Sequence, residues 1–166
     1  MANTVRFKLV TPTALIFDGE AELVIGVTTE GEEGILPRHA PFLAALKPGV
    51  LRANVLAQNS LSPSERSERS PERSPSTALR IDSAESKGSR LELATSEGFM
   101  QAFPDRIAVL VDEAVRFEDV VVAETRSSLA EATERQKGVP VGSEQYAREQ
   151  AIIEFANAKL RLTGHR

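Results

Sequence analysis

Cysteine and tryptophan are absent from this sequence, and tyrosine occurs only once. Without cysteine, the chain has no disulfide, no thiolate metal site and no cysteine nucleophile. Without tryptophan, its core has to be mainly aliphatic, and an apolar fraction of 41% is enough to build one. Apolar runs long enough to span a membrane are also missing, and charged residues interrupt the first ten positions. We therefore expect a soluble chain of 166 residues, sized for one domain with an appendage.

An excess of positive charge is missing as well. The net charge of −4 gives no electrostatic reason to expect nucleic-acid binding. The tract most similar to an RNA-binding Arg-Ser segment is Ser62–Ser76, a degenerate Ser-Glu-Arg repeat. Its glutamates cancel its arginines, so counterion release would not drive phosphate binding. We interpret this tract as a passive loop.

The Ser/Glu/Arg-rich segment occupies about residues 59–89 and has no apolar side chain at its centre. Ordering it would cost backbone entropy with no burial to offset that cost, so we predict a disordered insertion at a hairpin tip. Deleting residues 61–77 should leave folding nearly unchanged, because shortening a flexible loop alters closure entropy by only about 1 kcal/mol. Calorimetry tests this: a melting temperature lowered by more than about 5 °C would mean that the loop packs somewhere.

Short segments of alternating apolar and polar residues fill most of positions 5–111, as in strands with one buried face. The predicted strands cover residues 5–9, 21–27, 50–56, 90–94, 99–103 and 106–111. In the second of these, one face is predicted to carry Ala21, Leu23, Ile25 and Val27. Turn signals separate the strands at Asp18-Gly19, Glu30-Gly31, Pro48-Gly49 and Pro104-Asp105. With no helices between the strands, the pattern predicts an antiparallel β-sandwich or barrel rather than parallel βαβ units.

After Asp112 the apolar period changes from two to about 3.6. A first helix is predicted over residues 122–137, ended by Gly138, and a second is predicted to begin after Ser143 and to reach about Leu162. The short Gly/Pro connection makes the two helices an antiparallel hairpin. The predicted fold is therefore α+β: an N-terminal antiparallel β-sandwich (residues 1–114) followed by a C-terminal antiparallel two-helix hairpin (residues 115–166).

The second helix carries two apolar stripes. They consist of Ala147, Ala151, Phe155, Ala158 and Leu162, and of Ile152, Ile153, Ala156 and Leu160. A helix with two apolar sides needs two partners. The first helix is one of them, and the other is either the sandwich or a different protein.

His39 is the only internal histidine, and Glu32 lies near it in the sequence. A metal or acid–base site would use these residue types, but the segment lacks a nucleophile, a second histidine ligand and a phosphate-binding glycine loop. We expect no catalytic, cofactor or metal site. Gly31 and Gly34 permit unusual dihedral angles, so the segment is better interpreted as a shaped turn.

Residues 29–49 resemble the signature of bacterial F-type ATP synthase epsilon subunits. That pattern is Glu-Gly-Glu-x-Gly, two apolar residues, Pro-x-His-Ala-Pro, and an apolar stretch ending in Lys-Pro-Gly. The residues that fit it are Glu30, Gly31, Glu32, Gly34, Pro37, His39, Ala40, Pro41, Lys47, Pro48 and Gly49. Residues 7–12, 109–114 and 159–162 are also similar, so the resemblance covers nearly everything except the insertion.

The resemblance implies a non-catalytic subunit of the proton-translocating rotary ATP synthase. It implies that the sandwich binds the gamma subunit and the c-ring, and that the hairpin folds against the sandwich or extends toward the alpha/beta catalytic head and blocks ATP hydrolysis. The implied location is peripheral, on the cytoplasmic face of the bacterial plasma membrane, through the complex alone. The implied c-ring or gamma contacts are Glu32 and His39. The implied regulatory residues of the hairpin are Arg126, Arg148, Phe155, Lys159 and Arg161.

Some members of that family bind ATP through an Ile/Leu-Asp-x-x-Arg-Ala motif on the first hairpin helix. The aligned stretch here is residues 122–127, in which Arg126 matches while Ala123 and Ser127 replace the acidic residue and the alanine. Losing the carboxylate removes a strong, orienting acceptor. We therefore expect neither a cofactor nor tight ATP binding.

Two other classes of protein fit parts of the sequence. One is a β-sandwich adaptor unrelated to ATP synthase, whose helices serve for dimerisation, and the other is a small enzyme centred on His39. Co-purification with a gamma subunit separates the first from the epsilon interpretation. A hydrolase or metal assay on His39→Ala tests the second.

Overall fold

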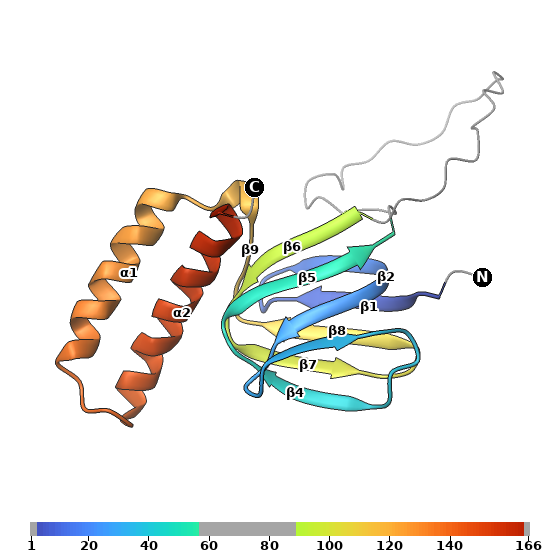
Figure 1. Cartoon of the computed structure of the whole chain (residues 1–166), viewed down its shortest axis with the longest axis horizontal. Coiled ribbons are helices and arrows are strands. Elements are labelled where there is room, and N and C mark those ends of the chain that lie inside the picture. The colour runs from blue at the N-terminus through green and yellow to red at the C-terminus, as the bar shows by residue number, and fades with distance from the viewer. Residues whose placement is uncertain (1–2, 57–88, 165–166) are drawn as a thin grey trace, which may run out of the picture.

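The computed structural model describes residues 3–56 and 89–164, which form a β-sandwich with a helical hairpin standing at one end (Figure 1). The strands are β1 (Val5–Val10), β2 (Leu15–Val27), β3 (Glu32–Ile35), β4 (Phe42–Leu46), β5 (Gly49–Val55), β6 (Ser89–Thr95), β7 (Gly98–Ala102), β8 (Arg106–Val111) and β9 (Ala114–Arg116). A short 3-10 helix, η1 (Phe117–Asp119), leads to α1 (Val122–Lys137) and α2 (Glu144–Gly164). The predicted α+β fold, a sandwich followed by a two-helix hairpin, is confirmed.

The strands are joined in the order β4-β7-β8-β1-β2-β5-β6-β9, with β3 paired to β2. The layers close where Thr28, just beyond β2, bridges to Leu46 of the edge strand β4. Among the described strands, the one departure from the antiparallel pattern is the parallel pairing of β1 with β8, in which Phe7 lies opposite Ile107. Strand direction depends on the path of the whole chain, and the alternation of apolar residues carries no record of it.

The core lies between the two layers and is aliphatic with a few aromatic rings, as the composition predicts. In β1, Val5, Phe7 and Leu9 are buried while the residues between them are exposed. The rings of Phe7 and Phe17 meet at a centroid distance of 5.3 Å. Fully burying one such side chain contributes about 1.5–3 kcal/mol, so the burial in these strands holds the sandwich together.

The predicted hairpin turn at Asp18-Gly19 is wrong. Strand β2 runs through both residues, and they lie opposite Lys8 and Phe7 of β1. The chain reverses earlier, where the Thr11 N–H donates to the Ala14 carbonyl at 2.9 Å. A local Asp-Gly turn signal is overridden here by the longer β1–β2 ladder.

Asp18 is held in the strand by its neighbours on β1. The Arg6 Nε donates to its carboxylate at 3.1 Å, and the Lys8 Nζ lies 3.4 Å away. The Arg6 hydrogen bond is the main reason that the pKa of the Asp18 carboxyl lies below its usual value. These cross-strand contacts replace the turn that an isolated Asp-Gly pair would favour.

The predicted apolar face of β2 is correct at Ala21 and wrong beyond it. The β2–β5 register shifts between Ala21 and Leu23, which is a β-bulge. After the bulge Val24 is fully buried, whereas Ile25 is only half-buried. One extra residue moves every later side chain to the opposite face, and a strict two-residue period does not contain that information.

The strands on either side of the insertion pair with each other, with Val55 of β5 opposite Ser89 of β6. The predicted hairpin is therefore confirmed, and the predicted disorder of the insertion falls on residues 57–88, which lie outside the described residues.

Both helices occupy the predicted positions. Gly138 caps the end of α1, and the Ser143 Oγ accepts the Tyr146 N–H at 3.1 Å at the start of α2. Two side-chain contacts then join the helices across the hairpin. The Arg135 Nε donates to Glu149 at 3.1 Å, and the Gln136 amide donates to the Gln150 Oε1 at 2.7 Å.

Candidate functional surfaces

An apolar row crosses the outer face of the sandwich. Paired residues on five neighbouring strands form it, and we call this set the outer row: Leu15, Val10, Leu110, Phe99 and Ala45. Phe99 is 58% exposed and Leu110 is 53% exposed, while their chain neighbours Met100 and Val109 are fully buried. Leu43, two residues before Ala45 on β4, is 67% exposed. Contiguous exposed apolar side chains of this kind mark sites of association with other proteins.

The hairpin rests on the sandwich through a small apolar contact. Buried Ala158 and Leu162 of α2 meet Ala94 of β6, and we call this contact the hairpin seat. Half-buried Val50, Val120 and Phe155 surround it. Figure 1 shows α2 between α1 and the sandwich, with β5 and β6 as its neighbours in the sheet. Within the described chain, no salt bridge joins either helix to a sandwich strand.

The two stripes of α2 therefore have different partners. The C-terminal part of the first stripe forms the hairpin seat against the sandwich. In the second stripe, buried Ala156 lines the crevice between the helices together with Thr125 of α1. Of the two candidates for the second partner, the structure identifies the sandwich. Ala147 in the first turn of α2 remains exposed.

Glu32 and His39 are not brought together. Glu32 pairs with Val27 near the end of β2, and its Oε2 accepts Arg52 Nη2 at 2.6 Å. This places Glu32 near Leu46, the last residue of β4, because Thr28 next to Val27 bridges to Leu46. His39 lies in the loop before Phe42, the first residue of β4. The Arg38 N–H connects that loop to the β7–β8 turn by donating to the Pro104 carbonyl at 3.1 Å. Glu32 instead lines a crevice with Arg161 of α2.

The His39 ring is half-buried and oriented by its neighbours. Its Nδ1–H donates to the Ala40 carbonyl at 2.8 Å, and its ring packs edge-on against Phe42 at 5.9 Å between centroids. Because a carbonyl oxygen can only accept, the Nδ1 atom carries the hydrogen of this bond. In the described part of the chain, no group of three acidic, histidine or cysteine side chains is placed to hold a metal.

The residues implied as regulatory lie along the hairpin without forming one site. Arg126 is exposed on α1, and Arg148 pairs with Glu144 one turn away at 2.6 Å. The Lys159 Nζ lies 4.0 Å from the centre of the Phe155 ring, beside the hairpin seat. Arg161, one residue before Leu162, is exposed at the edge of the seat.

Sequence patterns missed the outer row. Phe99 and Leu110 belong to different strands, and they become neighbours only through the β7–β8 register. Each of them is a large apolar residue at a position where its strand's alternation predicts an exposed, polar side chain. An apolar residue at a predicted exposed position was the sequence signal that could have indicated this surface.

Comparison with known proteins assigns this sandwich and hairpin to a class, the delta/epsilon chains of ATP synthases. Residues 4–61 match the family described as "ATP synthase, Delta/Epsilon chain, beta-sandwich domain". The ATP synthase epsilon chain 1 of Methylococcus capsulatus is 31% identical over 161 residues, covering 97% of this chain and 93% of that one. The epsilon chain of Magnetococcus marinus is 31% identical over 160 residues, with 96% and 94% covered. The chain belongs to the family of ATP synthase epsilon chains.

The fold also matches solved structures. A chain of the mitochondrial ATP synthase of Euglena gracilis superposes with a TM-score of 0.67 at 17% identity, covering 99% of this chain and 84% of that one. A chain from the central stalk and c-ring of the Tetrahymena thermophila mitochondrial ATP synthase gives 0.53 at 16% identity, with 93% and 96% covered. At these identities the likeness concerns the fold alone.

Proposed function

We propose that this chain is the non-catalytic coupling subunit of a proton-translocating rotary ATP synthase. Its sandwich joins the gamma subunit to the c-ring, and its hairpin restrains ATP hydrolysis by the alpha/beta head. The observation that carries the rotor role is the outer row, an apolar surface spread over five strands of an otherwise well-packed sandwich.

The outer row is proposed as the gamma-binding face. Phe99, between Leu110 and Ala45 in the row, is a large aromatic side chain that is more than half exposed, and such residues dominate binding energy when a partner covers them. The c-ring contact is proposed at the loop that carries His39, whose ring is held rigidly by Ala40 and Phe42. Glu32, the first residue of β3, forms a salt bridge with Arg52 and is kept as a second candidate contact.

Attachment to the membrane is proposed to occur through the complex, on the cytoplasmic face of the bacterial plasma membrane. Neither α1 nor α2 combines the length and apolarity that crossing a bilayer requires, and this holds for all the described helices. A peripheral position then depends on the rotor contacts.

The hairpin is proposed to alternate between the hairpin seat and an extended position near the catalytic head. The hairpin seat consists mainly of Ala94, Ala158 and Leu162, with no salt bridge among the described residues to hold it. Such a small contact keeps the two positions close in free energy, so that a partner with a modest preference shifts the balance. Arg148, Lys159 and Arg161 supply positive charge for acidic surfaces of the head.

Truncating the chain after Glu118 tests this role. Assembly and ATP synthesis should persist, because the outer row and the His39 loop both remain. Hydrolysis by the assembled enzyme should rise by about two- to fivefold, which corresponds to losing an inhibited state worth about 1 kcal/mol or less. The measurement compares ATP hydrolysis by full-length and truncated complexes at equal subunit occupancy.

The matched control is Phe99→Ser in the full-length chain, which should weaken assembly while the hairpin is intact. Equal hydrolysis rates for full-length and truncated complexes would refute the inhibitory role. A truncated chain that fails to assemble would assign the hairpin a structural role instead.

A further inference from the structure

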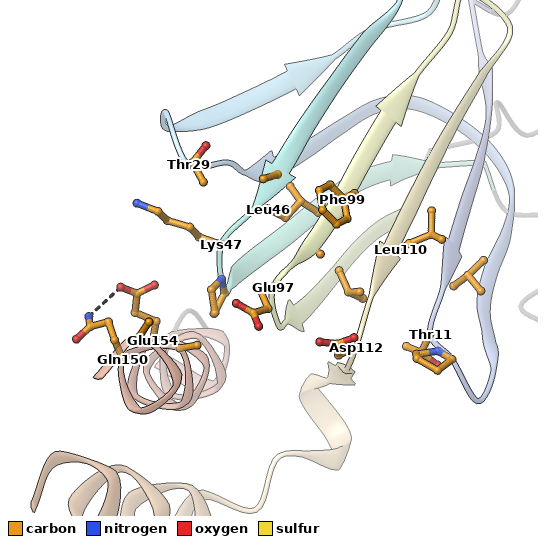
Figure 2. Close-up of a pocket in the computed structure, with 18 of the residues that line it drawn as sticks. Thr11, Thr29, Leu46, Lys47, Glu97, Phe99, Leu110, Asp112, Gln150 and Glu154 are labelled. Atoms are coloured by element: carbon orange, nitrogen blue, oxygen red, sulfur yellow. Dashed lines mark hydrogen bonds between the residues drawn. The ribbon is translucent and has the colours of Figure 1, made fainter. Parts of the chain in front are cut away.

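A groove of about 1120 Å³ lies between the N-terminal half of α2 and the adjoining ends of the sandwich strands (Figure 2). Phe99 of β7 and Leu110 of β8 line one wall, and Ala147 and Ala151 of α2 line the other. We call it the α2 groove. It begins where the hairpin seat ends, because α2 packs closely on the sandwich only farther along, near Ala158 and Leu162.

The walls of the α2 groove are apolar and largely uncovered. Phe99 and Leu110 are each more than half exposed, and Ala147 is exposed. The same two residues, Phe99 and Leu110, belong to the outer row, so the groove continues that surface around the end of the sandwich. Ala147 and Ala151 are one helical turn apart, and their small side chains let a second helix approach α2 to about 8 Å.

The charges around the groove are mostly acidic. Glu97 and Asp112 are adjacent, since the Asp112 N–H donates to the Glu97 carbonyl with 3.4 Å between nitrogen and oxygen. Figure 2 shows both carboxylates at the strand ends near α2. Glu154 on α2 accepts a hydrogen bond from Gln150 at 2.9 Å. Lys47 is the one basic residue among the described residues that line the groove, and in Figure 2 it extends away from Glu97 and Asp112.

We propose that the α2 groove docks an amphipathic helix of a partner protein, with small or medium apolar residues on one face and lysine or arginine beside them. The apolar face covers Phe99, Leu110 and Ala151, and the basic side chains reach Glu97 and Asp112. Because Phe99 and Leu110 also belong to the outer row, the docked helix competes with gamma for these two side chains. Neither carboxylate has an ion-pair partner among the described residues, so both are available to a ligand. Charge complementarity of this kind selects the partner and its orientation.

The position of the groove makes the docked helix a clamp on the hairpin. One wall belongs to the sandwich and the other to α2, so the intact groove exists only while the hairpin occupies its seat. A ligand that binds only the seated state stabilises that state by linkage. This regulatory consequence rests on the proposed movement of the hairpin, whereas the docking itself does not.

The test uses the full-length chain and a synthetic helical peptide of about 18 residues, with a leucine/alanine face flanked by lysines. A matched peptide carries glutamate in place of each lysine. Calorimetry should give a dissociation constant at least about tenfold lower for the lysine peptide, because only it complements Glu97 and Asp112. The combined change Glu97→Gln and Asp112→Asn should shrink that difference to about threefold or less. Binding of the two peptides with equal affinity would overturn the proposal.

Ala151→Glu locates the binding site. Ala151 lies on the groove side of α2 and is only half-buried, so the variant should fold, as circular dichroism checks, and should lose at least about tenfold in affinity for the lysine peptide. The control is Leu15→Asp, at the end of the outer row farthest from Phe99 in strand order, which should leave peptide binding unchanged.

Loss of binding in Leu15→Asp without loss in Ala151→Glu would move the site to the outer row. Sedimentation showing a homodimer that Ala151→Glu abolishes would replace the partner helix by a second copy. Either result leaves the truncation test of the hairpin unaffected.

Hydrogen exchange provides the readout of the clamp. Saturating lysine peptide should slow amide exchange in β6 around Ala94 and in α2 around Leu162, which are outside the groove but inside the hairpin seat. Unchanged exchange at the seat, with the peptide bound, would refute the clamp.

Discussion

Replacing Gly98 by alanine should destabilise the sandwich by about 2–4 kcal/mol, since the strands leave no space for a methyl group. A Cβ atom at this position would lie 2.0 Å from the Leu110 carbonyl oxygen and 2.8 Å from the Val111 Cα. Both are backbone atoms of β8, so no side-chain rotation relieves the clash. Strand β7 would have to separate from β8 at the Gly98–Val111 pair, near buried Met100.

Urea unfolding followed by circular dichroism measures this change. Gly34→Ala is the matched control, because the nearest atom to a Cβ there is the Leu23 Cδ1 at 3.6 Å, an ordinary contact. That variant should stay within about 0.5 kcal/mol of the parent. A Gly98→Ala protein with parental stability would show that β7 and β8 tolerate separation at this pair.

Replacing Ala158 by glutamate should release the hairpin from the sandwich while the strands remain folded. Ala158 is 3% exposed and packs in the hairpin seat with Ala94 and Leu162. Moving a carboxylate from water into this apolar contact costs more than the few kcal/mol that so small a contact contributes. Releasing the hairpin avoids that cost, so we expect the seated state to become a minor population.

Small-angle scattering and hydrogen exchange report this release. The radius of gyration should increase, and amides near Leu162 should lose protection by about 100-fold or more, while those of β1 remain protected. The control Arg161→Glu places a carboxylate at an exposed neighbouring position and should leave the hairpin seated. Loss of protection throughout the sandwich would mean instead that the hairpin and the strands unfold as one unit.

Sequence patterns located the helices well because their ends are set by single residues with local effects. Gly138 ends α1 and Ser143 caps α2 through its own side chain, so neither boundary depends on the rest of the fold. The alternation in β1 was equally informative, because one of its faces is completely buried. These are features that a short window of sequence contains.

The features that failed depend on pairing between distant segments. Asp18-Gly19 has the local signature of a turn, yet its pairing with Lys8 and Phe7 makes it part of a strand. The bulge after Ala21 likewise follows from which strands become neighbours. The outer row is the clearest case, because five strands contribute one residue each and no segment of the chain contains the surface.

The parallel pairing of β1 with β8 has a consequence for how the protein is made on the ribosome. Ile107 follows its partner Phe7 by 100 residues. At a synthesis rate of about 5–20 residues per second, β8 is translated about 5–20 s after β1. Until then the edge of β1 that pairs with β8 has no partner strand. For that interval β1 presents unpaired backbone groups to its surroundings, which is the situation in which nascent chains associate with each other. The insertion between β5 and β6 lengthens the delay, so early shielding by chaperones matters more for this chain than the stability of its finished sandwich would indicate.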